Sequence, residues 1–155
     1  MEYPNSRVFQ RIHENISDDS FFFFSVPTKL GKGTKSDPVH IMMTSKVLME
    51  NCQNIDKGFF EIDGTYRLTK NNYPWVVCGV VDKRGCFHPI AFMISNQETE
   101  DSFLKFFEGI AETADRMGVE FDPDFIMMDS CDASYGAAKA AFPHTTVLMC
   151  FFQQH

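Results

Sequence analysis

The sequence predicts an α/β fold, in which helices pack against a mixed β-sheet. Three strand-like segments follow one another in the middle of the chain, and helix-like and strand-like segments alternate after them. Of the 155 residues, 44% are apolar and 23% are charged, as in ordinary globular proteins. A chain of this length fits one domain with a sizeable core.

The first three strands are expected at Phe59–Tyr66, Trp75–Val81 and Cys86–Ile94. The segment Asp82–Gly85 is short and contains glycine, so the second and third strands should form an antiparallel hairpin. The segment Asn71–Pro74 is typical of a turn and should join the first two strands.

A helix is expected at Glu100–Met117, because its apolar residues recur at intervals of three and four. Gly118 suits the end of this helix. The apolar run Phe125–Met128 is typical of a central strand that is buried on both faces. A second helix at Ala133–Ala141 and a fifth strand at Thr145–Phe152 complete the pattern.

Residues 1–57 are expected to form a partly helical lead-in to a core that spans residues 58–155. Helices are compatible with Ser6–Ile16 and His40–Asn51, and Phe21–Phe24 is expected to be a buried strand or core segment. That run is too short to cross a bilayer, which takes about 20 apolar residues. The five cysteines form no Cys-x-x-Cys pair, which favours a reducing compartment.

The segment Gly31–Pro38 is a turn-rich loop. Its two lysines and two glycines suggest a phosphate-binding loop. However, their spacing does not match Gly-x-x-x-x-Gly-Lys-Ser/Thr, so this function is not expected.

The net charge of −7 argues against this chain forming a DNA-binding surface by itself. Between Asn96 and Asp132 there are 11 acidic residues and only two basic ones, Lys105 and Arg116. Contacts with DNA phosphates would therefore come largely from regions outside this chain.

Asp63 and Asp129 are the candidate metal ligands. Each stands in or directly after an apolar strand, where a carboxylate is costly to bury unless it is paired or bound to metal. If the first and fourth strands are neighbours, the two side chains converge at the end of the sheet where open α/β folds place their sites. Two such carboxylates suit Mg²⁺ or Mn²⁺, and a pair of these ions catalyses phosphodiester cleavage.

Other readings of the acidic residues stay open. Asp129 or Asp132 could cap the helix that begins near Ala133. Glu61 should share a strand face with Asp63, so it is either an accessory ligand or a solvated surface acid. Asp132 is the other possible accessory residue, whereas Glu98 and Glu100 suit the N-terminal dipole of the first helix.

Several short motifs occur in an order that resembles the Mutator-like element (MULE) transposase domain. The first half has an Asp-x-Thr-Tyr motif, a proline, a Pro-x-Ala motif and an acidic helix start, at Asp63–Tyr66, Pro74, Pro89–Ala91 and Glu98–Ser102. The second half has an acidic strand end and an alanine-rich helix that ends in Phe-Pro, at Ile126–Asp129 and Ala137–Pro143. The resemblance covers about residues 58–152.

This resemblance implies an RNase H-like core with a mixed five-stranded sheet of order 3-2-1-4-5, in which strand 2 is antiparallel. It further implies a DDE-type transposase that cleaves and joins DNA, with Asp63 and Asp129 as the first two catalytic acids and two Mg²⁺ or Mn²⁺ ions as cofactors. The implied location is the nucleus, and the implied partners are DNA and further copies of the chain, with no membrane.

The chain departs from the family pattern near its C-terminus. The third acid of the family lies downstream of a helical insertion, beyond His155, so the chain is expected to be a C-terminally truncated core that is inactive alone. The family's Cys-x-x-His is also absent: Cys150 is followed by Phe-Phe-Gln, and His155 is displaced by two positions. Cys150 is therefore expected to be a core residue rather than a ligand.

Two further functions are alternatives to an active transposase. One is a domesticated, non-catalytic protein derived from a transposase, which would serve as a DNA or protein interaction module or in transcription. The other is a 3′–5′ exonuclease of the same fold. The exonuclease is disfavoured because such enzymes have Asp-x-Glu on the first strand, whereas here Glu61 precedes Asp63.

Overall fold

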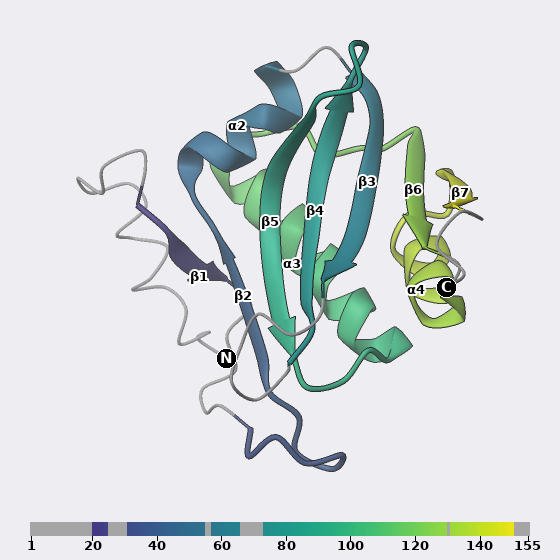
Figure 1. The fold of residues 1–155 in the computed structure, drawn as a ribbon. Helices are drawn as coiled ribbons and strands as arrows, with labels where there is room; N and C mark the ends of the chain where they lie inside the picture. Colours follow the sequence, from purple (N-terminus) through teal and green to yellow (C-terminus); the bar gives the residue numbers. More distant parts are fainter. Residues whose placement is uncertain (1–19, 25–30, 55–56, 66–72, 130, 151–155) are drawn as a thin grey trace.

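The computed structural model describes residues 20–24, 31–54, 57–65, 73–129 and 131–150 (Figure 1). In chain order these residues form β1 (Phe22–Phe24), β2 (His40–Thr44), α2 (Lys46–Asn54), β3 (Lys57–Thr65), β4 (Trp75–Asp82), β5 (Phe87–Ser95), α3 (Glu100–Met117), β6 (Phe125–Asp129), α4 (Asp132–Ala141) and β7 (Thr146–Cys150). The predicted α/β class is confirmed.

All of the described strands belong to one mixed sheet of seven strands, in the order β1-β2-β5-β4-β3-β6-β7. The four neighbouring pairs β1–β2, β2–β5, β5–β4 and β4–β3 are antiparallel, whereas the pairs β3–β6 and β6–β7 are parallel. The prediction of five strands was wrong, and the complete order differs from the predicted one. The reason is that β1 and β2, from the segment expected to be a lead-in, extend the sheet beyond β5.

The expectation of a helix at His40–Asn51 was wrong for its first five residues, which form β2. A short apolar run such as Ile41–Met43 fits either a strand or a buried helix, and here pairing with β5 makes it a strand. Helix α2 starts one residue after Ser45, whose hydroxyl accepts a hydrogen bond from the backbone N–H of Leu48 at 3.2 Å.

Two expectations for the N-terminal region have different outcomes. The predicted buried segment at Phe21–Phe24 is confirmed in large part, because Phe22 and Phe24 are buried in β1, although Phe21 is exposed. The expected helix at Ser6–Ile16 lies outside the described residues.

The core lies between one face of the sheet and the helices, with α3 crossing behind the strands in Figure 1. Phe106, Phe107 and Ile110 of α3 are fully buried there, and α4 adds Ala137 and Ala138. The predicted limits of α3 are confirmed. Its first turn is capped by the Thr99 hydroxyl, which accepts from the Ser102 N–H at 3.2 Å, and it ends at Gly118 with a φ of 66°.

The predicted β4–β5 hairpin is confirmed, and Asp82 organises its turn. One carboxylate oxygen accepts hydrogen bonds from the backbone N–H groups of Arg84 and Cys86 at 2.8 and 2.9 Å. The other lies 3.1 Å from Nε2 of His88. The hydrogen bonds from the Cys86 N–H and the His88 ring, together with the backbone N–H and the positive charge of Arg84, lower the pKa of Asp82 to about 2.

Gly79 marks a bulge in the same hairpin. The register of β4 against β5 shifts between Cys78 and Gly79, which leaves Ile90 as the extra, fully buried residue of β5. A Cβ on Gly79 would lie 2.6 Å from the carbonyl oxygen of His88 and would also overlap the ring of Phe87. The bulge therefore requires glycine for close packing.

Gly79→Ala is expected to lower the free energy of unfolding by about 1–3 kcal/mol, because the backbone at His88 must move to admit a methyl group. Gly85→Asn is the matched control, because Gly85 has a φ of 83°, which asparagine tolerates, and no atom within 4 Å of its Cβ position. Urea unfolding of the three proteins measures the effect. Equal stabilities of the Gly79 variant and the wild type would contradict this account of the bulge.

Asp82→Asn is expected to lower the melting temperature at pH 7, because it removes the charge that accepts the hydrogen bonds of the turn. The folded pKa of Asp82 lies below the ordinary value of 3.8, so its stabilising contribution is complete above that value and is lost as the pH falls through about 2. The difference between variant and wild type should therefore shrink between pH 4 and pH 2 in thermal melts. A difference that stays constant over this range would contradict the prediction.

Candidate functional site

The parallel pairing of β3 with β6 brings the two predicted acids together. Ile62 pairs with Met128, so the next residue on each strand, Asp63 and Asp129, continues the same register. Neighbouring strands lie about 4.8 Å apart. The two backbones are therefore adjacent at the point where both carboxylates leave the sheet.

Both acids lie on the sheet face opposite the core. Ile62 and Met128 are buried at 5% and 1% exposure, and side chains alternate between faces along a strand. Asp63 and Asp129 are accordingly half-buried on the other face, in front of which none of the described helices crosses in Figure 1. Glu61, two residues before Asp63, is half-buried on the same face and pairs in register with Met127.

The three acids interact electrostatically. Partial burial raises the pKa of Glu61 above its ordinary value, and the negative charges of Asp63 and Asp129 raise it further. Partial burial also raises the pKa of Asp129, with a second contribution from the charge of Asp63. The sheet thus gathers carboxylates that repel one another, an arrangement that favours a bound cation.

The capping role considered for Asp129 and Asp132 was wrong. The N-cap of α4 is Cys131, whose side chain makes no capping hydrogen bond. Asp132 lies in the first turn of α4 and is exposed, and the like charges that raise the pKa of Asp129 are those of Asp63, not of Asp132.

The start of α3 lies at the same end of the sheet. An oxygen of Glu98 is 3.7 Å from the position that a Cβ would take on Gly64, the residue after Asp63. Glu100 is in the first turn of α3, as its dipole role requires, and its carboxylate lies against Gly136 of α4. The capping residue, Thr99, was missed, although a threonine directly before the first helical residue, Glu100, is a recognisable signal.

Cys150 was expected in the core, but it is half-buried and lies outside the core cluster. It pairs with Asp129 in the register of β6 against β7. His155, the other residue of the displaced motif, lies outside the described residues.

The donor set at this end of the sheet suits a hard divalent cation. Carboxylate oxygens are the ligands that Mg²⁺ prefers, and Mg²⁺ is commonly held by one or two carboxylates together with waters and substrate phosphates. Within the described ranges, no group of three or more His, Cys, Asp or Glu side chains is close enough to hold a metal. The pair Asp63 and Asp129 could therefore supply part of a coordination shell.

The topology also favours a ligand site at this end of the sheet. The chain runs from β3 outward to β5 and then returns through α3 to β6, on the other side of β3. The strand order therefore reverses between β3 and β6. Open α/β sheets bind their ligands at such a reversal, beyond the carboxyl ends of the strands.

No helix among the described residues is long and apolar enough to cross a membrane.

The comparison with protein families agrees with the resemblance seen in the sequence. A search among curated proteins found no match to the chain. The family model of the MULE transposase domain matches residues 59–154, which include Asp63, Asp129 and every strand from β3 onward, except for the first two residues of β3. The match covers well over half of the sequence, and the chain therefore belongs to the MULE transposase family.

Proposed function

We propose that this chain forms part of the catalytic core of a DDE-type DNA transposase, with Asp63 and Asp129 as its first and second catalytic acids. The observation that carries the proposal is the in-register pairing of β3 with β6, which makes the two acids neighbours at the carboxyl ends of parallel strands. Both acids fall inside the segment that matches the MULE transposase domain.

The same proposal assigns the core to the RNase H-like fold. Its support is the part of the sheet ordered β5-β4-β3-β6-β7, with an antiparallel meander from β3 to β5 and parallel pairing of β3, β6 and β7. Helices α3 and α4 join β5 to β6 and β6 to β7, as the alternation of helix and strand in that fold requires.

In the proposed reaction, the Asp63 and Asp129 carboxylates would hold the divalent ions that act on a DNA phosphate. When bound, Mg²⁺ or Mn²⁺ activates the attacking oxygen and stabilises the leaving oxygen of an in-line displacement. Rigid strands fix both carboxylates, so little reorganisation is needed when substrate arrives. Glu61, on the same face, adds negative charge that strengthens cation binding.

The third acid of the reaction would come from a region outside this chain. DNA, bound largely through other regions, and further copies of the chain are the proposed partners, and the nucleus is the proposed location.

A domesticated, non-catalytic role is the second candidate. The net charge of −7 favours it, because an acidic protein repels DNA. The two candidates differ in one measurable property: only the catalytic core needs divalent ions at Asp63 and Asp129. Strand transfer by the complete gene product would exclude the second candidate.

Mg²⁺ or Mn²⁺ is expected to raise the melting temperature of the chain, by about 3–5 °C at a concentration ten times the dissociation constant. Asp63→Asn and Asp129→Asn should each abolish this shift, because each removes a ligand. Asp122→Asn, an exposed acid in the link between α3 and β6, is the matched control and should retain the full shift. The proposal fails if the three variants respond alike to the metal.

In the absence of divalent ions, Asp129→Asn is expected to raise the free energy of unfolding at pH 7 by about 0.2–1 kcal/mol, because it removes a partly buried charge and relieves its repulsion from Asp63. The folded pKa of Asp129 is raised, so its ionisation destabilises the folded state above that pKa, and this cost disappears as the pH falls below the ordinary carboxyl range. The extra stability of Asp129→Asn over the wild type should therefore also vanish as the pH falls below the ordinary carboxyl range. Chemical unfolding at several pH values measures it, and a variant less stable than wild type at pH 7 would contradict the prediction.

A further inference from the structure

A loop of residues 31–38 lies at the same end of the sheet as the acids. This end comprises the carboxyl ends of β3 and β6 and the start of β2, as the directions of pairing require. The 31–38 loop immediately precedes His40, the first residue of β2, and projects from the lower end of the sheet in Figure 1.

The loop has a defined shape, because Asp37 closes it. The Asp37 carboxylate accepts a hydrogen bond from the backbone N–H of Lys32 at 3.1 Å, and its carbonyl oxygen accepts from the Gly33 N–H at 3.0 Å. The Thr34 hydroxyl accepts in turn from the Asp37 N–H at 3.1 Å. Gly33 has a φ of 76°, a conformation that glycine adopts without strain.

The loop is also anchored to the elements that border the site. The Val39 N–H donates to the Asn96 side-chain oxygen at 2.7 Å, and the Gln97 side-chain nitrogen donates to the carbonyl of Thr34 at 3.0 Å. A Cβ on Gly33 would lie 2.7 Å from the hydroxyl of Tyr73, just before β4.

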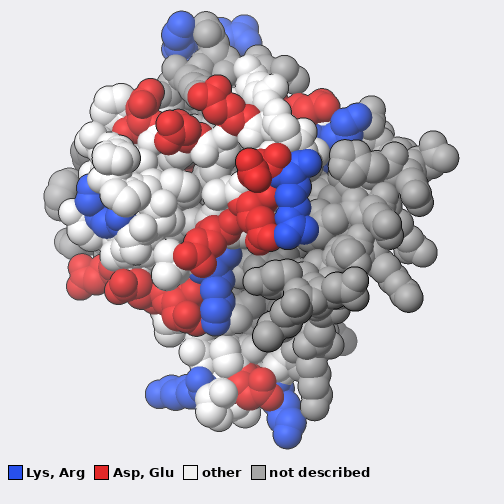
Figure 2. Space-filling model, turned by 180° about the vertical axis from the view of Figure 1, so that it is seen from behind, with Lys and Arg blue, Asp and Glu red and all other residues white. Residues whose placement is uncertain are grey.

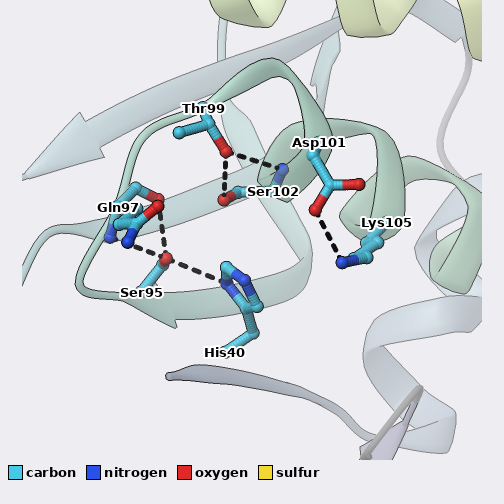
Figure 3. A network of polar contacts seen from close by, with 7 residues as sticks. All are labelled: His40, Ser95, Gln97, Thr99, Asp101, Ser102 and Lys105. Carbon is cyan, nitrogen blue, oxygen red and sulfur yellow. Dashed lines mark hydrogen bonds and ion pairs between the residues drawn. The ribbon is translucent and has the colours of Figure 1, made fainter. Parts of the chain in front are cut away.

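These anchors continue into the network drawn in Figure 3. The hydroxyl of Ser95 lies 2.9 Å from Nδ1 of His40 and 2.6 Å from the carbonyl oxygen of Gln97. Gln97 lies two residues before Thr99, which caps α3. Hydrogen bonds therefore tie the loop to the segment between β5 and α3, and tie that segment to β2, which holds the loop at this end of the sheet.

Lys32 and Lys35 are exposed on this loop, and their side chains form no ion pair within the described part of the chain. On α3, by contrast, Lys105 and Arg116 pair with Asp101 and Glu112 of the same helix. In Figure 2 the projection at the bottom carries basic groups on both sides of an acidic one, whereas acidic groups prevail across the middle of that face. The loop therefore offers two lysine side chains without an ion-pair partner among the described residues, and with Asp37 it carries a net charge of +1.

We propose that Lys32 and Lys35 bind the phosphate backbone of the DNA whose scissile phosphate lies at Asp63 and Asp129. This inference rests on the proposed function, and it assigns a part of the DNA contact to this chain. Four strand spacings separate β2 from β6, on the order of 20 Å. Phosphates follow one another at about 3.4 Å along each strand of B-DNA, so a duplex held at the acids reaches the loop after about six base pairs.

The test compares two charge-matched double variants of the full chain. Lys32→Ala with Lys35→Ala removes the loop charges, and Lys83→Ala with Arg84→Ala removes two charges from the β4–β5 turn at the opposite end of the sheet. Binding of a fluorescent 24-base-pair duplex is measured by anisotropy at several salt concentrations, without divalent ions. The loop variant should bind severalfold more weakly and should lower the slope of log K against log salt by about two.

The turn variant should bind DNA as the wild type does. The double variant Lys32→Arg with Lys35→Arg should also bind like the wild type, because it keeps both positive charges and changes only the shape of the side chains. Equal losses in the two alanine variants, no loss in the loop variant, or no binding by the wild type would each overturn the proposal. The metal titration of the Asp63 and Asp129 variants is independent of this result. If the loop variant loses DNA binding while the Asp63 and Asp129 variants still bind metal, the role of the loop in DNA binding stands and the catalytic role of the two acids is rejected.

Discussion

The register between β3 and β6 is the constraint on which the candidate site depends. Phe60, Ile62, Ile126 and Met128 are buried, and together they hold both strands with the same alternation of faces. A shift of either strand by one residue would turn its aspartate into the core and expose its apolar side chains. Burial of an unpaired carboxylate is costly, so the hydrophobic pattern itself holds the two acids side by side on the open face.

Much of this arrangement could be predicted from the sequence because its signals are local. The period of α3, the turn at Asp82–Gly85 and the apolar run that ends at Asp129 each depend on a few neighbouring residues. The two acids could be named because a carboxylate in or directly after an apolar strand is costly to bury unless it is paired or bound to metal. Their adjacency was not a local signal, and it was expected only from the order of strands in the related family.

The features that were missed depend on distant parts of the chain. The segment His40–Thr44 is a strand because it pairs with the free edge of β5, and nothing in the sequence of the segment itself indicates this pairing. The position of Cys150 on the side of Asp129, outside the core, follows from the register of β7, which the sequence does not specify. Likewise, the need for glycine at position 79 arises from Phe87 and His88 across the hairpin.

The separation of β3 from β6 along the chain has a consequence for folding during synthesis. The meander β3-β4-β5 is made of sequential antiparallel contacts and can form early, whereas the strand that completes β3 is translated more than 60 residues after Glu61. Until then β3 is an edge strand of the meander, and its unpaired backbone groups and apolar side chains can associate with other nascent chains. Pairing of β6 with β3 ends this exposure. Because α3 precedes β6 and must pack against the sheet for β6 to reach β3, the speed at which that helix packs sets how long the nascent chain is prone to aggregate.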